Sequence, residues 1–241
     1  MGTVRAGGVY KEGGTGGMRQ GVATTGLSAF VLGALLAAGC SESAVEKVKS
    51  PDQAKRLEGL QELARQDTPE ALTLAREVIA HEDVTTARAA VRTVSRMSRR
   101  SAVSVLARVA AEEKRPQVRE EAVLALSYGR EPSSADELRQ VLRTDADPRV
   151  RAAAATGLGR IGNLSDVEFL LEVADKDTEP LVQSHAVGAL DRLLGIGFTF
   201  DASAPAEDRQ VTLRLIRQAA MIRAQVLRAR ATGAQAKAGG P

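Results

Sequence analysis

Residues 147–162 read Asp-Pro-Arg-Val-Arg-Ala-Ala-Ala-Ala-Thr-Gly-Leu-Gly-Arg-Ile-Gly and contain the start and the packed face of one helix. Asp147 suits the N-cap position, where its carboxylate accepts from free backbone N–H groups. Pro148 suits the first helical position, because its fixed φ is already helical and its missing N–H is not needed there. The four alanines that follow are small enough for a neighbouring helix to approach closely. The stretch therefore predicts a closely packed helix.

The same apolar pattern recurs every 32 residues on both sides of this stretch. Each repeat contains two apolar sets, so each repeat is predicted to contain two helices. A weaker, earlier copy holds Leu60 and Leu74, and its second helix opens at Thr68-Pro69-Glu70. About five such units predict a stack in which each unit is stabilised mainly by its neighbours. The first set is Ala90-Val91, Ala122-Val123, Ala154-Ala155 and Ala186-Val187, and the second is Leu106 and Val109, Leu138 and Val141, and Leu170 and Val173.

A serine recurs between the two helices of three units, at Ser101, Ser133 and Ser165. A serine hydroxyl can accept from the first backbone N–H groups of a helix. Asp136 and Glu168 follow two of these serines by three residues, as in a capping box. The serines are therefore predicted to cap the second helices.

Residues 147–162 resemble the signature of HEAT and HEAT-like repeats, and the resemblance extends over residues 51–195. It implies an all-α fold, an α-solenoid of about five HEAT-like helix pairs, which we expect to end in a longer C-terminal capping helix. In this family the arginine after the valine commonly pairs with acidic groups of a neighbouring unit. That role would fall to Arg119 and Arg151 here, with Asp147 as part of the same structural ladder.

The N-terminal segment has the composition of a secretory leader. Residues 20–40 carry no charge, follow Arg19 and end at Cys40, the only cysteine. Leu36-Ala37-Ala38-Gly39 resembles the lipobox of bacterial lipoproteins. The resemblance implies cleavage before Cys40 and acylation of that residue. We therefore expect a signal peptide over residues 1–39, with Met18 as an alternative start, and a lipidated cysteine with a linker over residues 40–50. An uncleaved membrane anchor and a buried helix are the alternatives.

Charge is unevenly distributed along the chain. From Cys40 onward there are 30 basic and 29 acidic residues, a net charge of +1 that gives no argument for nucleic-acid binding. Residues 40–208 carry a net charge of −6, whereas residues 209–241 hold seven basic residues and no acidic one. The body is acidic and the tail is basic.

The tail is predicted to form an irregular loop and a capping helix over residues 196–230, followed by a flexible segment over residues 231–241. Apolar residues recur at three- and four-residue steps along one face of this helix, and arginines surround that face. One interpretation is a terminal cap with solvated arginines. The other is that the basic helix, residues 209–230, contacts anionic lipid headgroups or an acidic partner. The apolar face comprises Val211, Leu215, Ala219, Ile222 and Val226.

No pattern in the chain nominates catalytic chemistry. His81 and His185 are the only histidines and lie in different repeats, so no shared metal site is expected. Nucleophile elbows, phosphate-binding loops and paired cysteines do not occur. We therefore expect no cofactor, no metal and no enzymatic activity. HEAT-like lyases that act on a chromophore- or cofactor-bearing partner provide the alternative function.

The sequence favours a membrane-tethered interaction scaffold of the bacterial cell envelope, anchored through Cys40, with the outer membrane facing the periplasm as the expected location. The partner is expected to be a protein that the sequence does not identify. The second helices are predicted to line a concave face, as solenoids bind partners along such faces. The expected contact residues are Arg108, Arg139, Arg143, Glu168 and Glu172.

Overall fold

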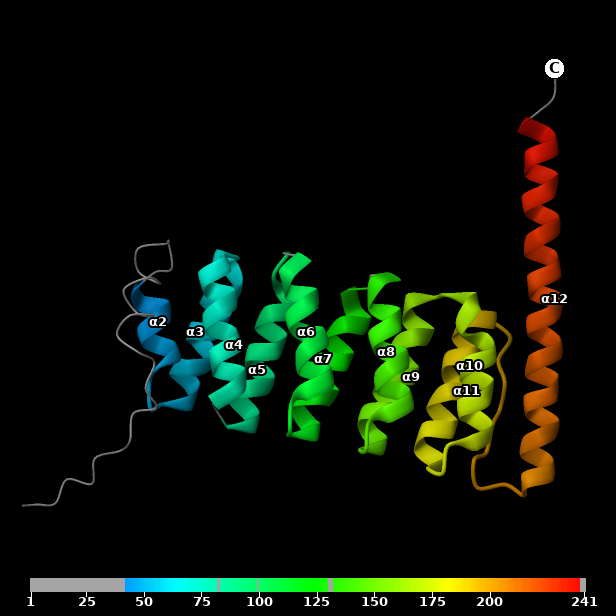
Figure 1. The fold of residues 1–241 in the computed structure, drawn as a ribbon, viewed down its shortest axis with the longest axis horizontal. Coiled ribbons are helices and arrows are strands. Elements are labelled where there is room, and N and C mark those ends of the chain that lie inside the picture. Colours follow the sequence, from blue (N-terminus) through cyan, green and yellow to red (C-terminus); the bar gives the residue numbers. More distant parts are fainter. Residues whose placement is uncertain (1–41, 82, 99, 130–131, 239–241) are drawn as a thin grey trace, which may run out of the picture.

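A computed structural model describes residues 42–81, 83–98, 100–129 and 132–238. These residues form helices that follow one another in a single two-layered row, with a long C-terminal helix beside the last pair (Figure 1). The all-α solenoid predicted from the repeats is confirmed. The helices are α2 (Glu42–Val48), α3 (Gln53–Gln66), α4 (Pro69–His81), α5 (Val84–Arg96), α6 (Arg100–Glu112), α7 (Pro116–Gly129), α8 (Ala135–Thr144), α9 (Pro148–Ile161), α10 (Val167–Lys176), α11 (Pro180–Leu194) and α12 (Ala206–Ala238), with 3₁₀ turns η1 (Pro132–Ser134) and η2 (Leu164–Asp166).

The first helices of the units, α3, α5, α7, α9 and α11, form one layer. The 32-residue register predicted for this layer is confirmed, because Ala90, Ala122, Ala154 and Ala186 are all fully buried. Small residues bring the helices close together. A Cβ built on Gly159 of α9 would lie 2.7 Å from the Cα of Ala189 in α11. The layer is thus held by near backbone-to-backbone contact.

The second helices, α4, α6, α8 and α10, form the other layer, but they pair differently from the prediction. Each packs more closely on the first helix that follows it than on the first helix of its own unit. Connection length does not account for this preference, because three residues separate α5 from α6 and three also separate α6 from α7. The tight antiparallel hairpins are α6 with α7, α8 with α9 and α10 with α11.

The serine caps predicted for the second helices are wrong. Ser101 lies inside α6, and Ser133 and Ser165 lie inside η1 and η2. The side chain of Asn163 instead accepts from the backbone N–H of Ser165, at 3.0 Å, and so caps η2. At Ser133 and Ser165 the 3₁₀ turn shifts the start of the following helix beyond the serine, whereas α6 already begins at Arg100, one residue before Ser101.

The segment predicted as a linker over residues 40–50 is largely helical. Ala44, Val45 and Val48 of α2 are buried against α3, so α2 covers the N-terminal end of the stack. At Gly59 of α3 an added Cβ would lie 2.7 Å from the backbone nitrogen of Val48. This close approach lets α2 dock as a half-unit. Within the described residues, the stack therefore begins at α2.

The long helix α12 packs on α10 and α11, as a terminal cap should, but it does so with an unexpected face. Its buried side chains are Leu213 and Ile216. The apolar face predicted from the sequence points away from the stack, with Leu215 and Ile222 more than half exposed. The helix also continues to Ala238, past the expected boundary at residue 230. Apolar residues lie on two sides of α12, and periodicity alone could not say which side packs.

A candidate docking groove between α4 and α6

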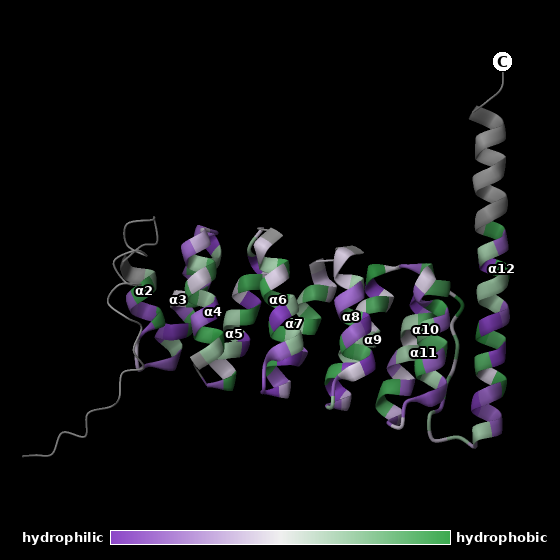
Figure 2. Cartoon of the chain, viewed as in Figure 1, coloured by the Kyte–Doolittle hydropathy of each residue, from purple (hydrophilic) through white to green (hydrophobic). Residues whose placement is uncertain are grey.

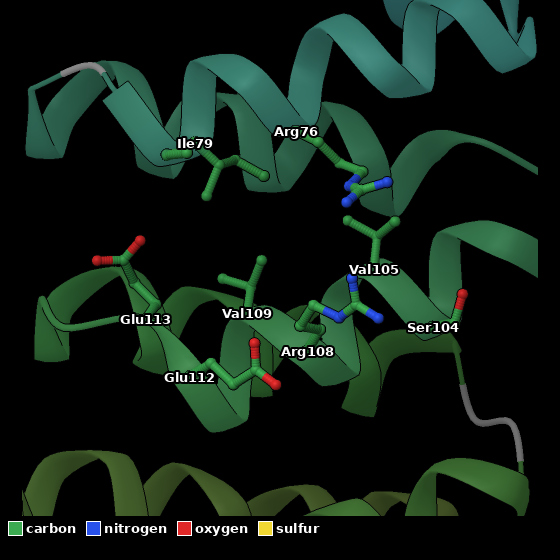
Figure 3. A pocket seen from close by; sticks show the side chains of 9 residues that line it. Arg76, Ile79, Ser104, Val105, Arg108, Val109, Glu112 and Glu113 are labelled. Carbon is green, nitrogen blue, oxygen red and sulfur yellow. The ribbon is translucent and has the colours of Figure 1, made fainter.

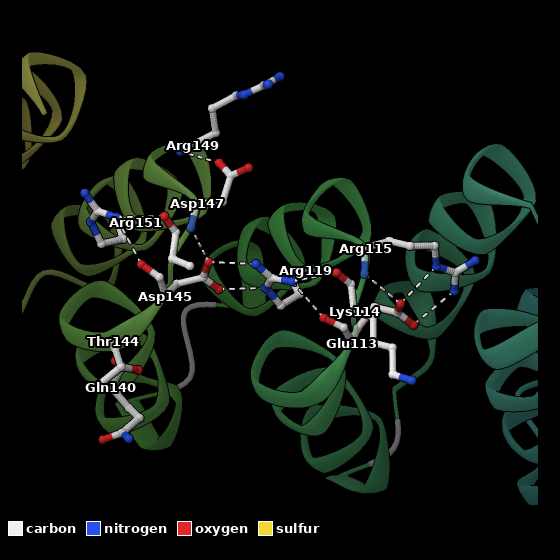
Figure 4. A network of polar contacts seen from close by, with 11 residues as sticks. Glu113, Lys114, Arg115, Arg119, Gln140, Thr144, Asp145, Asp147, Arg149 and Arg151 are labelled. Atoms are coloured by element: carbon white, nitrogen blue, oxygen red, sulfur yellow. Dashed lines mark hydrogen bonds and ion pairs between the residues drawn. The ribbon is translucent and has the colours of Figure 1, made fainter.

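Arginine–aspartate ion pairs tie successive hairpin turns together (Figure 4). Arg119 of α7 donates to both carboxylate oxygens of Asp145, at 2.7 and 2.8 Å, and Arg151 of α9 does the same to Asp177, at 2.9 Å. Arg119 also donates to the backbone oxygens of Glu113 and Lys114 in its own turn. The pairing that the HEAT resemblance implied for these two arginines is present.

The ladder is structural rather than a free binding surface. The carboxylate of Asp145 is 6% exposed, and the side chain of Arg119 is 13% exposed. The hydrogen bond to Asp145 raises the pKa of Arg119 further above its usual value, because the charged form is the one that is bound. Asp147 caps α9 by accepting from the backbone N–H of Arg149, at 2.8 Å, as predicted. These residues hold the stack in register and leave little for a ligand.

Four of the five predicted contact residues are engaged within the chain. Arg139 donates to Asp166 at 2.5 Å and also pairs with Asp136. The guanidinium of Arg143 stacks on the ring of Phe169, 5.0 Å from its centroid. These contacts connect α8 to η2 and to α10.

The two acidic residues among the predicted contact residues also form ion pairs within the chain. Glu168 pairs with Arg217 of α12 at 3.4 Å. Glu172 accepts from Lys176 at 3.0 Å, and this hydrogen bond holds the pKa of Glu172 below its ordinary value. Both carboxylates are largely exposed, so these pairs are weak and exchangeable.

Arg108 differs from the other four because it lines a groove and has no intramolecular partner in the described part of the chain. The groove lies between α4 and α6 and has a volume of about 330 Å³. Ile79, Val105 and Val109 form its apolar floor. Figure 3 shows the guanidinium groups of Arg76 and Arg108 directed towards each other at one end of it.

The opposite end of the groove is acidic. Glu113 lines this end and is held by a 2.9 Å ion pair with Arg115, while Glu112 lies between Glu113 and Arg108, one helical turn from the arginine (Figure 3). The hydrogen bond from Arg115 lowers the pKa of Glu113. The groove therefore has an apolar floor with two unpaired cations at one end and carboxylates towards the other.

Arg76 was missed by the sequence analysis, although a signal was present. It lies 32 residues before Arg108 and so occupies the same position in the preceding unit. The same position holds Gln140 and then Glu172 in the next two units. The 32-residue period that relates the buried positions therefore also relates the two arginines.

The spacing of the helices argues against the predicted concave face. Neighbouring first helices pack directly on each other, whereas neighbouring second helices touch little and leave grooves between them. A two-layered stack bends towards the layer whose helices are closer together, and that distance depends on side-chain size. The alanine-rich first helices are thus on the inner side, and the α4–α6 groove opens on the outer layer.

The sequence also matches a family model described as HEAT repeats, over residues 41–127 and 110–191. The chain belongs to the HEAT-repeat family. A comparison with curated proteins gave no match. The HEAT region begins close to the predicted lipidation site, so α2 is part of the repeat region and not of a tether.

Cys40 and the predicted signal peptide lie outside the described residues. Within the described residues, no helix is both long enough and apolar enough to cross a membrane. In the same part of the chain, no group of three or more histidine, cysteine, aspartate or glutamate side chains is placed to hold a metal ion.

Proposed function

We propose that this HEAT-repeat protein is a non-enzymatic protein-interaction scaffold, and that it binds an acidic segment of its partner in the α4–α6 groove. The observation that carries the proposal is the juxtaposition of Arg76 and Arg108 above an apolar floor, with no carboxylate of the chain paired to either. Elsewhere in the stack, arginines such as Arg92, Arg119 and Arg151 are bound by an aspartate or glutamate of a neighbouring unit. A carboxylate of the partner would provide the opposite charge that Arg76 and Arg108 do not find in the described part of the chain.

The groove specifies the chemistry of its occupant. Apolar side chains would cover Ile79, Val105 and Val109, while carboxylates would accept charge-assisted hydrogen bonds from the two arginines. Glu112, one helical turn beyond Arg108, and Glu113 at the other end would repel a second acidic group. A segment with an apolar middle and acidic residues at one end fits this pattern, and the charge difference fixes its direction.

The charge gradient along the second helices favours the same site. The position occupied by Arg76 and Arg108 becomes Gln140 in α8 and Glu172 in α10. An acidic segment is therefore attracted to α4 and α6 and repelled by α10. Electrostatic complementarity of this kind contributes mainly to orientation and to the rate of association.

We also propose that the scaffold is anchored to the bacterial envelope by acylation of Cys40, in the outer membrane facing the periplasm. The support is the composition of residues 20–40 and the position of Cys40. Since α2 begins at Glu42, hardly any chain would separate the acyl groups from the stack. The anchor would then hold the α2 end of the solenoid against the bilayer.

The groove can be tested by charge reversal combined with photo-crosslinking. A photoreactive amino acid in place of Ser104, which is exposed and lines the groove, reports the occupant in living cells. Arg76→Glu/Arg108→Glu should abolish the specific adduct. The matched control is Arg96→Glu/Arg149→Glu, which reverses two exposed arginines outside the groove and should leave the adduct unchanged.

All variants should melt at the same temperature, because the four arginines are exposed and carry no intramolecular ion pair in the described residues. An adduct that survives reversal of Arg76 and Arg108 would rule out the groove as an acidic-segment site. Loss of the adduct in the control variant as well would mean that the overall charge, not the groove, attracts the partner.

The anchor can be tested by metabolic labelling with a fatty-acid analogue. Label in the wild type that disappears in Cys40→Ala, together with loss of the protein from the membrane fraction, is the expected result. Unlabelled full-length protein in the cytoplasm would overturn the export proposal and would bring the lyase-type alternative back into consideration.

A further inference from the structure

The outward face of α12 carries an apolar strip that nothing in the described residues covers. Its four large side chains are between 44% and 55% exposed. At 3.6 residues per turn they lie in one narrow line, on the side of the helix opposite to the buried residues Leu213 and Ile216. Figure 2 shows apolar and polar residues mixed along the coloured part of α12, as expected for a helix that is apolar on two sides. The four residues are Val211, Leu215, Ile222 and Val226.

We propose that this strip is the contact by which two copies of the chain join end to end, with their α12 helices antiparallel. A two-fold contact requires that residue i of one copy meets residue j of the other while j meets i. The strip has the spacing that this demands. Its residues are separated by four, seven and four positions, so the pattern is the same in both directions. Antiparallel pairing sets Val211 opposite Val226 and Leu215 opposite Ile222.

Charge supports the same arrangement. The first turn of α12 contains Glu207 and Asp208, and no acidic residue follows them to the end of the chain. The two-fold register brings this acidic turn level with residues 228–230 of the second copy, a segment whose sequence contains Arg228 and Arg230. Parallel pairing would put the acidic turns of both copies together.

The rest of the molecule does not obstruct this contact. The strip faces away from α10 and α11, so the two stacks would extend in opposite directions from the paired helices (Figure 1). The strip spans 16 residues, so its ends are about 22 Å apart along the helix. Such a contact buries less than the roughly 1,200 Å² typical of stable complexes, so the dimer is weak and depends on concentration. The joined stack would present two α4–α6 grooves, although the dimer does not depend on what those grooves bind.

Sedimentation velocity of the reduced full chain in mild detergent tests the association. The wild type should shift from monomer to dimer as its concentration rises through the micromolar range. Leu215→Lys/Ile222→Lys should weaken this at least about tenfold, which corresponds to 1.4 kcal/mol. Leu181→Lys, a change at a similarly exposed apolar residue on α11, should behave like the wild type. Melting temperatures should agree, since all three residues are exposed.

Cysteine cross-linking tests the direction of the helices, in a Cys40→Ala background that removes the only native cysteine. Ala219→Cys lies next to the two-fold axis and should form an intermolecular disulfide on mild oxidation. Val211→Cys lies on the same strip, but its counterpart would be about 22 Å away, beyond the roughly 7 Å Cα separation that a disulfide allows. It should therefore stay monomeric.

Three results would contradict the proposal. A dimer that Leu215→Lys/Ile222→Lys leaves intact would place the contact elsewhere. A second outcome is a wild type that remains monomeric but binds vesicles of anionic lipid. If the Arg214→Gln/Arg223→Gln variant did not bind these vesicles, α12 would be a membrane-surface helix instead. Equal disulfide formation at Ala219→Cys and Val211→Cys would contradict the antiparallel register.

Discussion

At the scale of single residues, the stack depends on which acidic residue each arginine pairs with. The repeats place an acidic residue 32 positions apart at Glu113, Asp145 and Asp177. The arginine partners of the last two were predictable from the HEAT signature. The partner of Glu113 could not be predicted in this way, because Ala87 occupies the corresponding arginine position in α5. Arg115 pairs with Glu113 instead. A degenerate repeat thus conserves the ion pair in space while moving it in sequence.

Arg119→Leu should destabilise the fold by about 3 kcal/mol, because Asp145 would keep its charge in a buried position without its partner. Urea denaturation measures this change. Arg119→Leu/Asp145→Leu removes both charges and should cost clearly less than the single change. A double variant at least as unstable as Arg119→Leu would mean that packing, rather than the stranded carboxylate, sets the loss.

Glu121 gives the stack a dependence on acid pH. Burial alone would raise the pKa of its carboxyl, but hydrogen bonds from Arg92 and Arg88 more than offset this, so the pKa is lowered from its ordinary value of 4.5. A lowered folded-state pKa stabilises the fold above the unfolded pKa, and that stability is lost as the pH falls through the folded value. The wild type should therefore lose more stability below about pH 5 than Glu121→Gln does.

Chemical denaturation at a series of pH values measures this difference between the proteins. The control is Glu120→Gln, which removes a neighbouring carboxylate that makes no ion pair in the described residues and should keep the wild-type profile. Parallel profiles for the wild type and Glu121→Gln would show that the arginine bridge contributes nothing to the pH dependence.

At the scale of whole helices, the sequence predicted the packing of the repeated helices but not that of α2 and α12, the helices at the two ends of the described stack. The first-helix layer could be predicted because alanine and valine recur at buried positions at a fixed spacing. The α2 cap was missed because a helix of seven residues has no periodicity to detect. The packing face of α12 was missed because Val211 and Leu213 lie on opposite sides of the same helix, and only the neighbouring helices determine which side is buried.

Two glycines in neighbouring helices test how close the first helices must be. Gly159→Ala should destabilise the fold by roughly 1–3 kcal/mol, because the new methyl group would collide with the backbone of Ala189 and push α9 and α11 apart. Gly188→Ala, in α11, meets no atom within 4 Å and should stabilise the fold by about 0.5–1 kcal/mol through its higher helix propensity. Thermal unfolding compares the two. Changes of the same sign would contradict the proposed close contact.

At the scale of the molecule, the candidate site could be predicted only in part. Arg108 was selected from its place on a second helix, but the groove exists because α4 and α6 are held apart by the closer packing of α3, α5 and α7 behind them. Single-sequence patterns carry no information on such spacing. They also could not show that Arg139 and Arg143 are occupied by Asp166 and Phe169.

A row of units that contact only their neighbours should lose stability locally. Leu158 of α9 is fully buried, so Leu158→Ala should cost about 2–5 kcal/mol. Hydrogen exchange should accelerate in α9 and in the adjacent α7 and α11, and much less in α2 and α3, because nearest-neighbour coupling weakens along a solenoid. Leu60→Ala, at a buried leucine of α3, should give the reverse gradient. If both changes accelerated exchange uniformly from α2 to α11, the stack would unfold as one cooperative unit, and the additive view of its repeats would be wrong.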